Sequence, residues 1–315
     1  MLLRNANSIS TVGIVGCGLI GIGWTSIFLS KGYRVIATDI DGDAEQRIKS
    51  EVEKTWQDLV RLGISDDASP DKLEFNASLK DTCNSVDFIQ ENSPDVVDLK
   101  QSLLETIDRF APPDIIISSS TSGIEKQVLD NRCRHKDRVI VGHPFHPVHL
   151  MPLVEIVASE AAAPIAESFY EGVGKSVVVL EKDVPGFIAN RFQEAIWREA
   201  LHMVSAGEAT PAQIDRAIVN GPGLRWPILG PFMARELGCG YGGIDALIAE
   251  EYDDPMPESW SRTPLPKMTP DLEKAMREGS EVLCAGKSYS ERVTERDKKI
   301  MAILEARRGP DKNPT

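Results

Sequence analysis

Short apolar segments recur along the first half of the chain, and polar stretches with helical periodicity separate them. These segments, rich in Val and Ile, span residues 11–15, 34–39, 86–91, 114–118, 138–142, 153–157 and 176–180. Several lack alternating polar positions, which is typical of strands buried on both faces of a parallel sheet. Residues 44–62 carry apolar positions at helical spacing, and residues 73–75 resemble a short edge strand. The pattern predicts a doubly wound α/β domain.

The strand pattern ends at the sequence Asp-Val-Pro-Gly of residues 183–186, which we expect to be a hinge. Residues 187–206 then predict one long helix. Two Thr-Pro pairs, at Thr210 and Thr269, match an N-cap followed by proline at the first helical position. Residues 290–308 predict a charged amphipathic helix. The second half is therefore expected to be all helical.

A length of 315 residues favours two domains over one. We predict a Rossmann-type doubly wound domain over residues 1–185, followed by an all-helical C-terminal domain over residues 186–315. The composition, 42% hydrophobic and 26% charged, is sufficient for a sizeable core.

Net charge narrows the class of protein further. A net charge of −13 argues against nucleic-acid binding and against docking on an anionic membrane. No apolar run reaches the roughly 18 residues of a membrane span, and residues 1–10 lack a signal-peptide core. The five cysteines form no CxxC pair, which suits a reducing compartment. We expect a cytoplasmic enzyme without nucleic-acid or membrane partners.

A glycine-rich motif follows the first apolar segment. It reads Gly16-Cys17-Gly18-Leu19-Ile20-Gly21 and leads into an apolar stretch that can be a helix. Glycine at these positions permits a tight turn, close approach of a pyrophosphate, and close packing of helix on strand. The helix N-terminus adds free amides for the phosphates. The motif therefore predicts a dinucleotide site.

Asp39, at the end of the second strand, is suited to binding the ribose hydroxyls of that dinucleotide. Its charge would repel a 2′-phosphate, which favours NAD over NADP. Arg34 and Lys31 are near in sequence and leave the NADP alternative open.

The segment of residues 138–157, RVIVGHPFHPVHLMPLVEIV, carries the candidate chemistry. His143 follows one strand, and Glu155 lies within the next apolar strand. A carboxylate in an apolar run needs a partner, and a histidine at a neighbouring strand end is a natural one. Such a pair forms a general base, because the carboxylate fixes the tautomer of the ring. A purely structural hydrogen bond is the alternative.

The motifs GCGLIG, IQENSPDVVDLK, SSSTSG, GHPFHPVHLMPLVEIV and VPGFIANRFQEAIWREALHMV occur in this order from residue 16 to about residue 204. Through them the chain resembles the 3-hydroxyacyl-CoA dehydrogenase superfamily. The residues of the fourth motif, and the sequence GPGLRWPILGPF later in the chain, resemble those of one branch of this superfamily. That branch contains carnitine 3-dehydrogenase and lambda-crystallin, which is an L-gulonate 3-dehydrogenase. Beyond about residue 233 the resemblance is loose.

The resemblance implies a role for four residues in catalysis. His143 would take the proton of a 3-hydroxyl group, and Glu155 would orient it. Ser122 would hydrogen-bond the substrate oxygen, and Asn190 would hold the same region. A helix N-cap for Ser122, and capping or packing for Asn190, remain as alternatives.

The resemblance also places Glu91 and Lys100 near the nicotinamide end of the cofactor, with a merely solvated Lys100 as the alternative. It implies a homodimer formed through the helical domain. The chain departs from the family at His146, where the motif usually has Asn, and at Ser120, where acyl-CoA enzymes generally carry Asn. His146 can be charged near neutral pH and is therefore a candidate for substrate contact.

A metal site is the alternative reading of the histidines at positions 143, 146 and 149. Pro144 and Pro147 interrupt the segment and prevent helical convergence of the rings, and hydride transfer requires no metal. We therefore expect no metal.

In the relatives that bind CoA, the helical insert after the second strand supplies cations for its phosphates. The corresponding sequence here, RLGISDDASPDK at residues 61–72, is acidic in its middle, so we expect a small free hydroxy acid as substrate. Within the branch that the chain resembles, this implies L-carnitine as the favoured 3-hydroxy substrate, followed by L-gulonate and by a short-chain L-3-hydroxyacyl-CoA. Arg225 is suited to pairing a substrate carboxylate. The rival functions are a structural protein, as lambda-crystallin is, and a cofactor-binding regulatory module.

Overall fold

The computed structural model describes residues 2–227, 230–231 and 269–271, and isolated positions between 274 and 305. The chain divides into two compact units, the first comprising Met1–Asn190 and the second beginning at Arg191. The candidate chemistry lies in the first unit.

The first unit is built on one sheet of eight strands in the order β3-β2-β1-β4-β5-β6-β7-β8. The strands are β1 (Thr11–Val15), β2 (Arg34–Thr38), β3 (Leu73–Phe75), β4 (Phe88–Glu91), β5 (Ile116–Ser119), β6 (Val139–Pro144), β7 (Leu153–Val157) and β8 (Ser176–Val179). The reversal of strand order beside β1 is the doubly wound arrangement, so the predicted Rossmann-type fold is confirmed.

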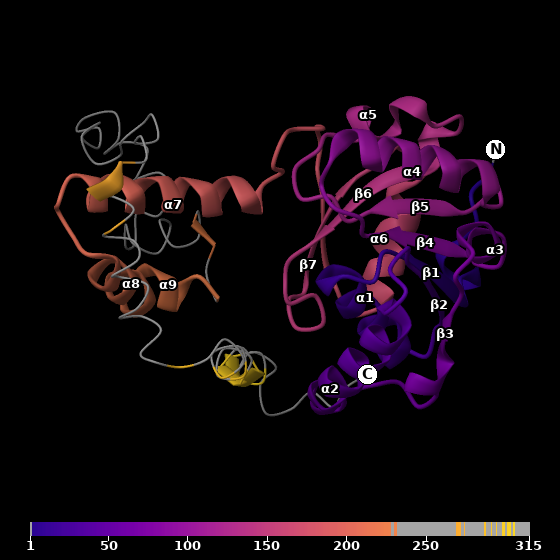
Figure 1. Ribbon diagram of the computed structural model, residues 1–315, viewed down its shortest axis with the longest axis horizontal. Coiled ribbons are helices and arrows are strands. Elements are labelled where there is room, and N and C mark those ends of the chain that lie inside the picture. Colours follow the sequence, from indigo (N-terminus) through magenta and orange to yellow (C-terminus); the bar gives the residue numbers. More distant parts are fainter. Residues whose placement is uncertain are drawn as a thin grey trace, which may run out of the picture. The chain divides into compact units, whose positions relative to one another are not determined.

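Helices cover both faces of this sheet, and Figure 1 shows α4 and α5 opposite α1 and α2. Their bounds are α1 (Leu19–Ser30), α2 (Ala44–Leu62), α3 (Leu79–Asn84), α4 (Val97–Phe110), α5 (Lys126–Leu129) and α6 (Ala163–Gly172), with short 3-10 helices η1 (Ala6–Ser8), η2 (Pro70–Lys72), η3 (Asp130–Arg132) and η4 (Lys136–Arg138). One core cluster joins α1, α2 and α6 to the sheet. A second joins α3, α4 and α5 to the opposite face.

Helix α1 is almost completely buried, as a helix without a polar face must be. Its residues Trp24 and Phe28 stack at 5.3 Å between ring centroids, and the rings of Phe169 and Tyr170 of α6 pack against them. This aromatic layer fixes the helix that follows the glycine-rich motif.

The sheet is parallel apart from one pair. Strands β6 and β7 run antiparallel, with His143 opposite Glu155 in the register. The apolar pattern alone had favoured parallel strands here. Only residues 145–152 join β6 to β7, and a parallel crossover needs a dozen or more residues. The short loop therefore forces the chain back along the neighbouring strand.

Every described segment with regular structure after Gly186 is helical, in agreement with the predicted all-helical part. Helix α7 (Ala189–Ser205) is followed by α8 (Pro211–Asn220) and α9 (Pro222–Arg225). Thr210 caps α8 as predicted: its hydroxyl oxygen accepts a hydrogen bond from the Gln213 amide, and its own amide donates one to the Gln213 side chain. Most of the helix predicted over 290–308 lies outside the described residues. None of the described helices is long and apolar enough to cross a membrane.

Candidate active site

The glycine-rich turn joins β1 to α1 at the carboxyl end of the strand. Gly16 adopts a φ of 93°, a conformation that favours glycine. A Cβ atom at Gly21 would lie 2.0 Å from the Gly16 carbonyl oxygen, so close helix–strand packing requires glycine there. Open space surrounds the Cβ position of Gly18, which also begins α1 without a side-chain cap. The first amides of α1, from Leu19 and Ile20, thus remain for an anion.

Asp39 follows β2 directly and reaches back to this turn. Its Oδ2 accepts a hydrogen bond of 2.6 Å from the Cys17 amide, and its Oδ1 accepts one from Asp41. The side chain is partly exposed, and each carboxylate oxygen keeps a lone pair for a ribose hydroxyl.

The two cations that left the NADP alternative open have other partners. Arg34 lies at the opposite, amino end of β2 and pairs with Glu74 at 2.5 Å. Lys31 donates to the Gly63 carbonyl at 3.1 Å. This arrangement supports NAD as the dinucleotide.

His143 and Glu155 form a buried pair across β6 and β7. His143 is 4% exposed and Glu155 1% exposed, and Nδ1 of the ring lies 2.9 Å from Oε2 of the carboxylate. An ionised carboxylate only accepts hydrogen bonds, so Nδ1 carries the proton. Nε2 has no hydrogen-bond partner among the described residues. It is the ring nitrogen left to accept a proton.

The second oxygen of Glu155 binds the start of α7. Oε1 accepts hydrogen bonds of 2.8 Å from the Ile188 amide and 3.0 Å from the Ala189 amide. Burial opposes ionisation of Glu155, but these bonds and the one from His143 outweigh it and hold the pKa of Glu155 below its usual value. The carboxylate is therefore ionised at neutral pH.

Two aromatic rings hold the imidazole in place. The ring of Phe145 lies 5.2 Å from that of His143, and the ring of Phe187 lies 5.3 Å away. Phe187 is fully buried and has a φ of 52°, which is unusual for a side chain of its size. Strained backbone of this kind clusters at functional sites. Here it lies two residues before α7 begins.

Ser122 and Asn190 are in direct contact. The Asn190 side chain donates to the Ser122 carbonyl at 2.6 Å. The amide and hydroxyl of Ser122 both donate to Oδ2 of Asp95, at 2.8 and 2.5 Å. One continuous network thus joins β6, β7, the start of α7, the turn after β5 and the turn after β4.

Asp95 is the residue of this network that the sequence analysis missed. These bonds from Ser122 outweigh the opposing effect of burial and lower the pKa of Asp95. Its position at the N-terminus of α4, four residues after β4 ends, was the signal that could have identified it, because carboxyl ends of parallel strands carry the ligand groups.

Glu91 and Lys100 form a buried pair beneath this edge, and the Lys100 ammonium also lies 3.6 Å from Oδ1 of Asp95. Lys100 Nζ lies 3.0 and 3.1 Å from the two oxygens of Glu91, and both side chains are at most 1% exposed. Ser93 and Ser119 also donate to the carboxylate. The alternative of a solvated Lys100 is therefore wrong. The predicted role of the two residues in cofactor binding stays a prediction.

Ser120 points into the fold. Its hydroxyl accepts hydrogen bonds from Trp24 at 3.1 Å and Gln90 at 2.8 Å, and donates to Asn92 at 2.8 Å. All three bonding positions of the hydroxyl are used. The departure from the family motif at Ser120 thus serves the packing of α1 on the sheet.

The remaining candidates are less defined. His146 lies exposed on the loop between β6 and β7. Arg225 is the last residue of α9, and its side chain lies outside the described residues. Their proposed contacts with substrate stay predictions.

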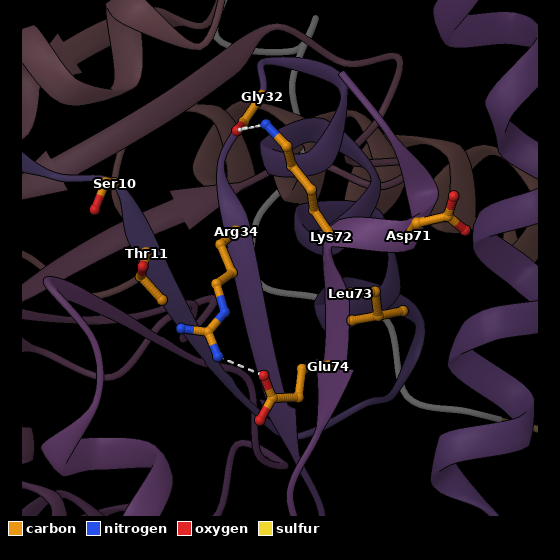
Figure 2. A pocket seen from close by; sticks show the side chains of 8 residues that line it. All are labelled: Ser10, Thr11, Gly32, Arg34, Asp71, Lys72, Leu73 and Glu74. Atoms are coloured by element: carbon orange, nitrogen blue, oxygen red, sulfur yellow. Dashed lines mark hydrogen bonds and ion pairs between the residues drawn. The ribbon is translucent and has the colours of Figure 1, made fainter. Parts of the chain in front are cut away.

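A shallow hollow of about 560 Å³ lies far from this chemistry. Figure 2 shows that Thr11, Arg34 and Leu73 line it. These are the first residues of β1, β2 and β3, so the hollow is at the amino edge of the sheet. His143 and Ser119 lie at the carboxyl ends of their strands. Since ligands of doubly wound sheets bind at the carboxyl edge, the hollow is not the candidate active site.

The comparisons with known proteins agree with this geometry. The model of the 3-hydroxyacyl-CoA dehydrogenase NAD binding domain matches residues 11–184, and the model of the C-terminal domain of the same family matches residues 186–281. The chain belongs to the 3-hydroxyacyl-CoA dehydrogenase family. It is an oxidoreductase that acts on CH–OH groups, and its cofactor is NAD.

Curated relatives cover nearly the whole chain. An L-carnitine dehydrogenase of Streptomyces coelicolor is 41% identical and covers 99% of this chain and 99% of its own length. An L-carnitine dehydrogenase of Nocardiopsis dassonvillei is 42% identical, with 95% and 92% covered. Among solved structures, an NAD-dependent 5-formyl-3-hydroxy-2-methylpyridine 4-carboxylic acid 5-dehydrogenase has a TM-score of 0.79 at 23% identity, with 94% and 99% covered, and shows the shared fold.

Proposed function

We propose that this protein oxidises the 3-hydroxyl group of L-carnitine to the 3-oxo acid with NAD as the hydride acceptor. The observation that carries the chemistry is the buried His143–Glu155 pair, whose Nε2 is left without a partner among the described residues. The choice of L-carnitine is supported by the relatives that carry this activity in their names.

The described residues fit NAD. Gly18 leaves open space where a side chain would stand, and the adjacent start of α1 supplies amides for the pyrophosphate. Asp39 would bind the adenosine ribose hydroxyls. When bound, NAD supplies the nicotinamide ring that accepts the hydride from the carbon bearing the hydroxyl group.

His143 is proposed to act as the general base. Nε2 accepts the proton of the 3-hydroxyl group as the carbon loses its hydride, so the oxygen is left as a carbonyl. Glu155 holds the ring in the tautomer with a free Nε2 and stabilises the imidazolium that forms. Because the pair is buried, this electrostatic support acts with little screening from solvent.

Ser122 is proposed to bind the substrate oxygen, and Asp95 to hold the turn that carries Ser122. In the structure the Ser122 amide and hydroxyl donate to Asp95. Because the one proton of the substrate hydroxyl goes to His143, the Ser122 hydroxyl is proposed to turn from Asp95 and donate to the substrate oxygen. Asn190 fixes the backbone of that turn through the Ser122 carbonyl. It acts by positioning.

A free hydroxy acid is favoured over a thioester by the turn after α2. Asp66 and Asp67 are exposed there, and the Lys72 ammonium binds the Gly32 carbonyl and Asp67. A phosphate needs available cations, and this turn instead presents carboxylates. Arg225 is proposed as the partner of the substrate carboxylate.

The test is NADH formation, followed by absorbance, with NAD and a panel of L-carnitine, D-carnitine, L-gulonate, L-3-hydroxybutyrate and 3-hydroxybutyryl-CoA. We expect strong turnover of L-carnitine only, with NAD strongly preferred to NADP. Turnover of the thioester alone would overturn the argument from the acidic turn. An unchanged KM for L-carnitine in Arg225→Lys would remove Arg225 from the site.

We further propose that the protein is cytoplasmic and forms a homodimer. Each chain is proposed to have two domains, with the boundary between residues 185 and 186. The cysteines at positions 17, 83 and 133 are free and buried, which is compatible with a reducing compartment. Sedimentation of the purified full-length chain as a monomer would overturn the dimer.

A further inference from the structure

The loop between β6 and β7 connects the two members of the catalytic pair. It comprises residues 145–152, between His143 on one strand and Glu155 on the other. A slip of one residue in the register of these strands would turn Glu155 to the other face of the sheet. The conformation of this loop therefore matters for the contact between carboxylate and imidazole.

Lys175 reaches the loop from the residue before β8. Its Nζ donates hydrogen bonds to the Val148 carbonyl and, at 2.9 Å, to the Met151 carbonyl. Lys175 is 7% exposed, and no carboxylate pairs with it among the described residues. The ammonium group is thus committed to the backbone of the loop.

A buried ammonium without a counter-ion is unfavourable, and burial lowers the pKa of Lys175 to about 7. The two carbonyls and the ring of Trp24, 5.1 Å from Nζ, are what compensate for the lost water. A methionine would fill similar space without this cost. The feature that only the lysine supplies is the pair of bonds to the loop.

The same loop rests directly on α1. A Cβ atom at Gly23 would lie 2.7 Å from the Cβ of Val148, so the loop approaches the helix as closely as glycine allows. Trp24, the next residue of α1, lies under the Lys175 ammonium and donates to Ser120. Helix α1 begins at the cofactor-binding turn, so the loop and that turn share one rigid support.

We propose that Lys175 is a positioning residue that fixes the β6–β7 loop on α1 and thereby holds His143 in place relative to the cofactor-binding turn. Lys175 acts through the Val148 and Met151 carbonyls and touches no reacting atom. The kinetic part of this inference rests on the proposed function, since it requires a substrate that turns over.

The kinetic test compares Lys175→Met with Lys182→Met, a matched change at an exposed lysine nearby. We expect Lys175→Met to lower kcat for L-carnitine by about 10- to 100-fold, because small misplacements of a catalytic group have effects of this size. The Kd of Lys175→Met for NAD should match that of the wild type. The kcat and KM of Lys182→Met should also match those of the wild type. Lys175→Arg keeps a cationic donor and should recover part of kcat.

A purely structural role predicts a different result. It would lower the Tm of Lys175→Met but leave kcat and KM at wild-type values below the unfolding transition, and this outcome would overturn the proposal. If the Met variant does not fold, Lys175→Gln replaces it, because glutamine is polar but too short to reach both carbonyls.

Hydrogen–deuterium exchange tests the inference without any substrate. The Leu150 and Met151 amides bond to the Pro147 carbonyl within the loop, and Lys175 should protect them. We expect faster exchange of residues 148–151 in Lys175→Met and unchanged exchange in Lys182→Met. Unchanged exchange in both variants would overturn the proposal whether or not L-carnitine is oxidised. Faster exchange in Lys175→Met, in a protein whose wild type oxidises none of the tested hydroxy substrates, would support the role of Lys175 in fixing the loop and would overturn the proposed function.

Discussion

Two buried carboxylates at the same edge of the sheet have different surroundings. Glu91 binds Lys100, Ser93 and Ser119, so every strong bonding position around it is used. Glu155 is equally well bonded, but its partner His143 keeps one nitrogen without a partner among the described residues. The first pair is closed and the second is open.

This difference in bonding indicates that the Glu91–Lys100 pair stabilises the fold, whereas the His143–Glu155 pair can take part in proton transfer. All strong acceptor positions of the Glu91 carboxylate are used within the protein, and removing this carboxylate leaves the buried Lys100 with only the more distant Asp95 carboxylate, 3.6 Å away. An open pair has a titratable atom that a hydroxyl group can reach. We therefore expect changes in the open pair to affect turnover above all, and changes in the closed pair to affect the free energy of unfolding; the role of Glu91 and Lys100 in cofactor binding stays a prediction.

His143→Ala tests the open pair most directly. We expect kcat/KM for L-carnitine to fall by about 10³-fold, since a positioned general base contributes on this order. The Kd for NAD, measured by titration calorimetry, should stay unchanged because His143 lies outside the glycine-rich turn. Activity within tenfold of the wild type would show that another group takes the proton.

Glu91→Gln tests the closed pair. Lys100 would then be buried with only the partly exposed Asp95 carboxylate 3.6 Å away. This should lower the free energy of unfolding by about 3 kcal/mol, measured by urea denaturation. The double variant Glu91→Leu/Lys100→Met removes both charges and should lose less than the single variant. A double variant as unstable as the sum of both single changes would contradict a coupled pair.

Glu155→Gln should affect both turnover and stability. We expect kcat/KM to fall by about 10²-fold, because the amide no longer stabilises the imidazolium. The depressed pKa of Glu155 adds stability that is present above the free value of 4.5 and is lost as pH falls through the folded-state pKa. The Tm difference between wild type and variant should thus be largest at neutral pH and shrink below 4.5. A constant difference would contradict the lowered pKa.

Lys49→Ala gives the smallest expected effect. Lys49 pairs with Glu45 at 2.5 Å on the surface of α2, and both side chains are about half exposed. Exposed pairs contribute little to stability. Neither Tm nor kcat/KM should change measurably, and a clear loss of turnover would show that the contrast between the two buried pairs is not specific.

Much of the fold could be predicted from the apolar pattern. Strands 11–15 and 153–157 and the helix over 44–62 have the predicted bounds, because each buries a face whose period is visible in the sequence. The antiparallel direction of β7 could not be read from its apolar residues. It depends on the short connection of residues 145–152.

The site was predictable only in part. His143 and Glu155 lie in one motif, and their pairing follows from two adjacent strands. The burial of Lys100 and the bonds of Asp95 and Lys175 depend on neighbours 9 to 27 residues away in sequence. No local pattern records such contacts, since a lysine in a helix or before a strand is usually solvated.

The bonds of Glu155 to the start of α7 have a consequence for how this position can vary. One carboxylate both orients the base and caps the entry to the helix. Aspartate is one methylene shorter and cannot span both sets of partners from the same backbone, and glutamine offers only one acceptor oxygen for the two tasks. Sequence drift at residue 155 is thus restricted twice over, by the reaction and by the path of the chain.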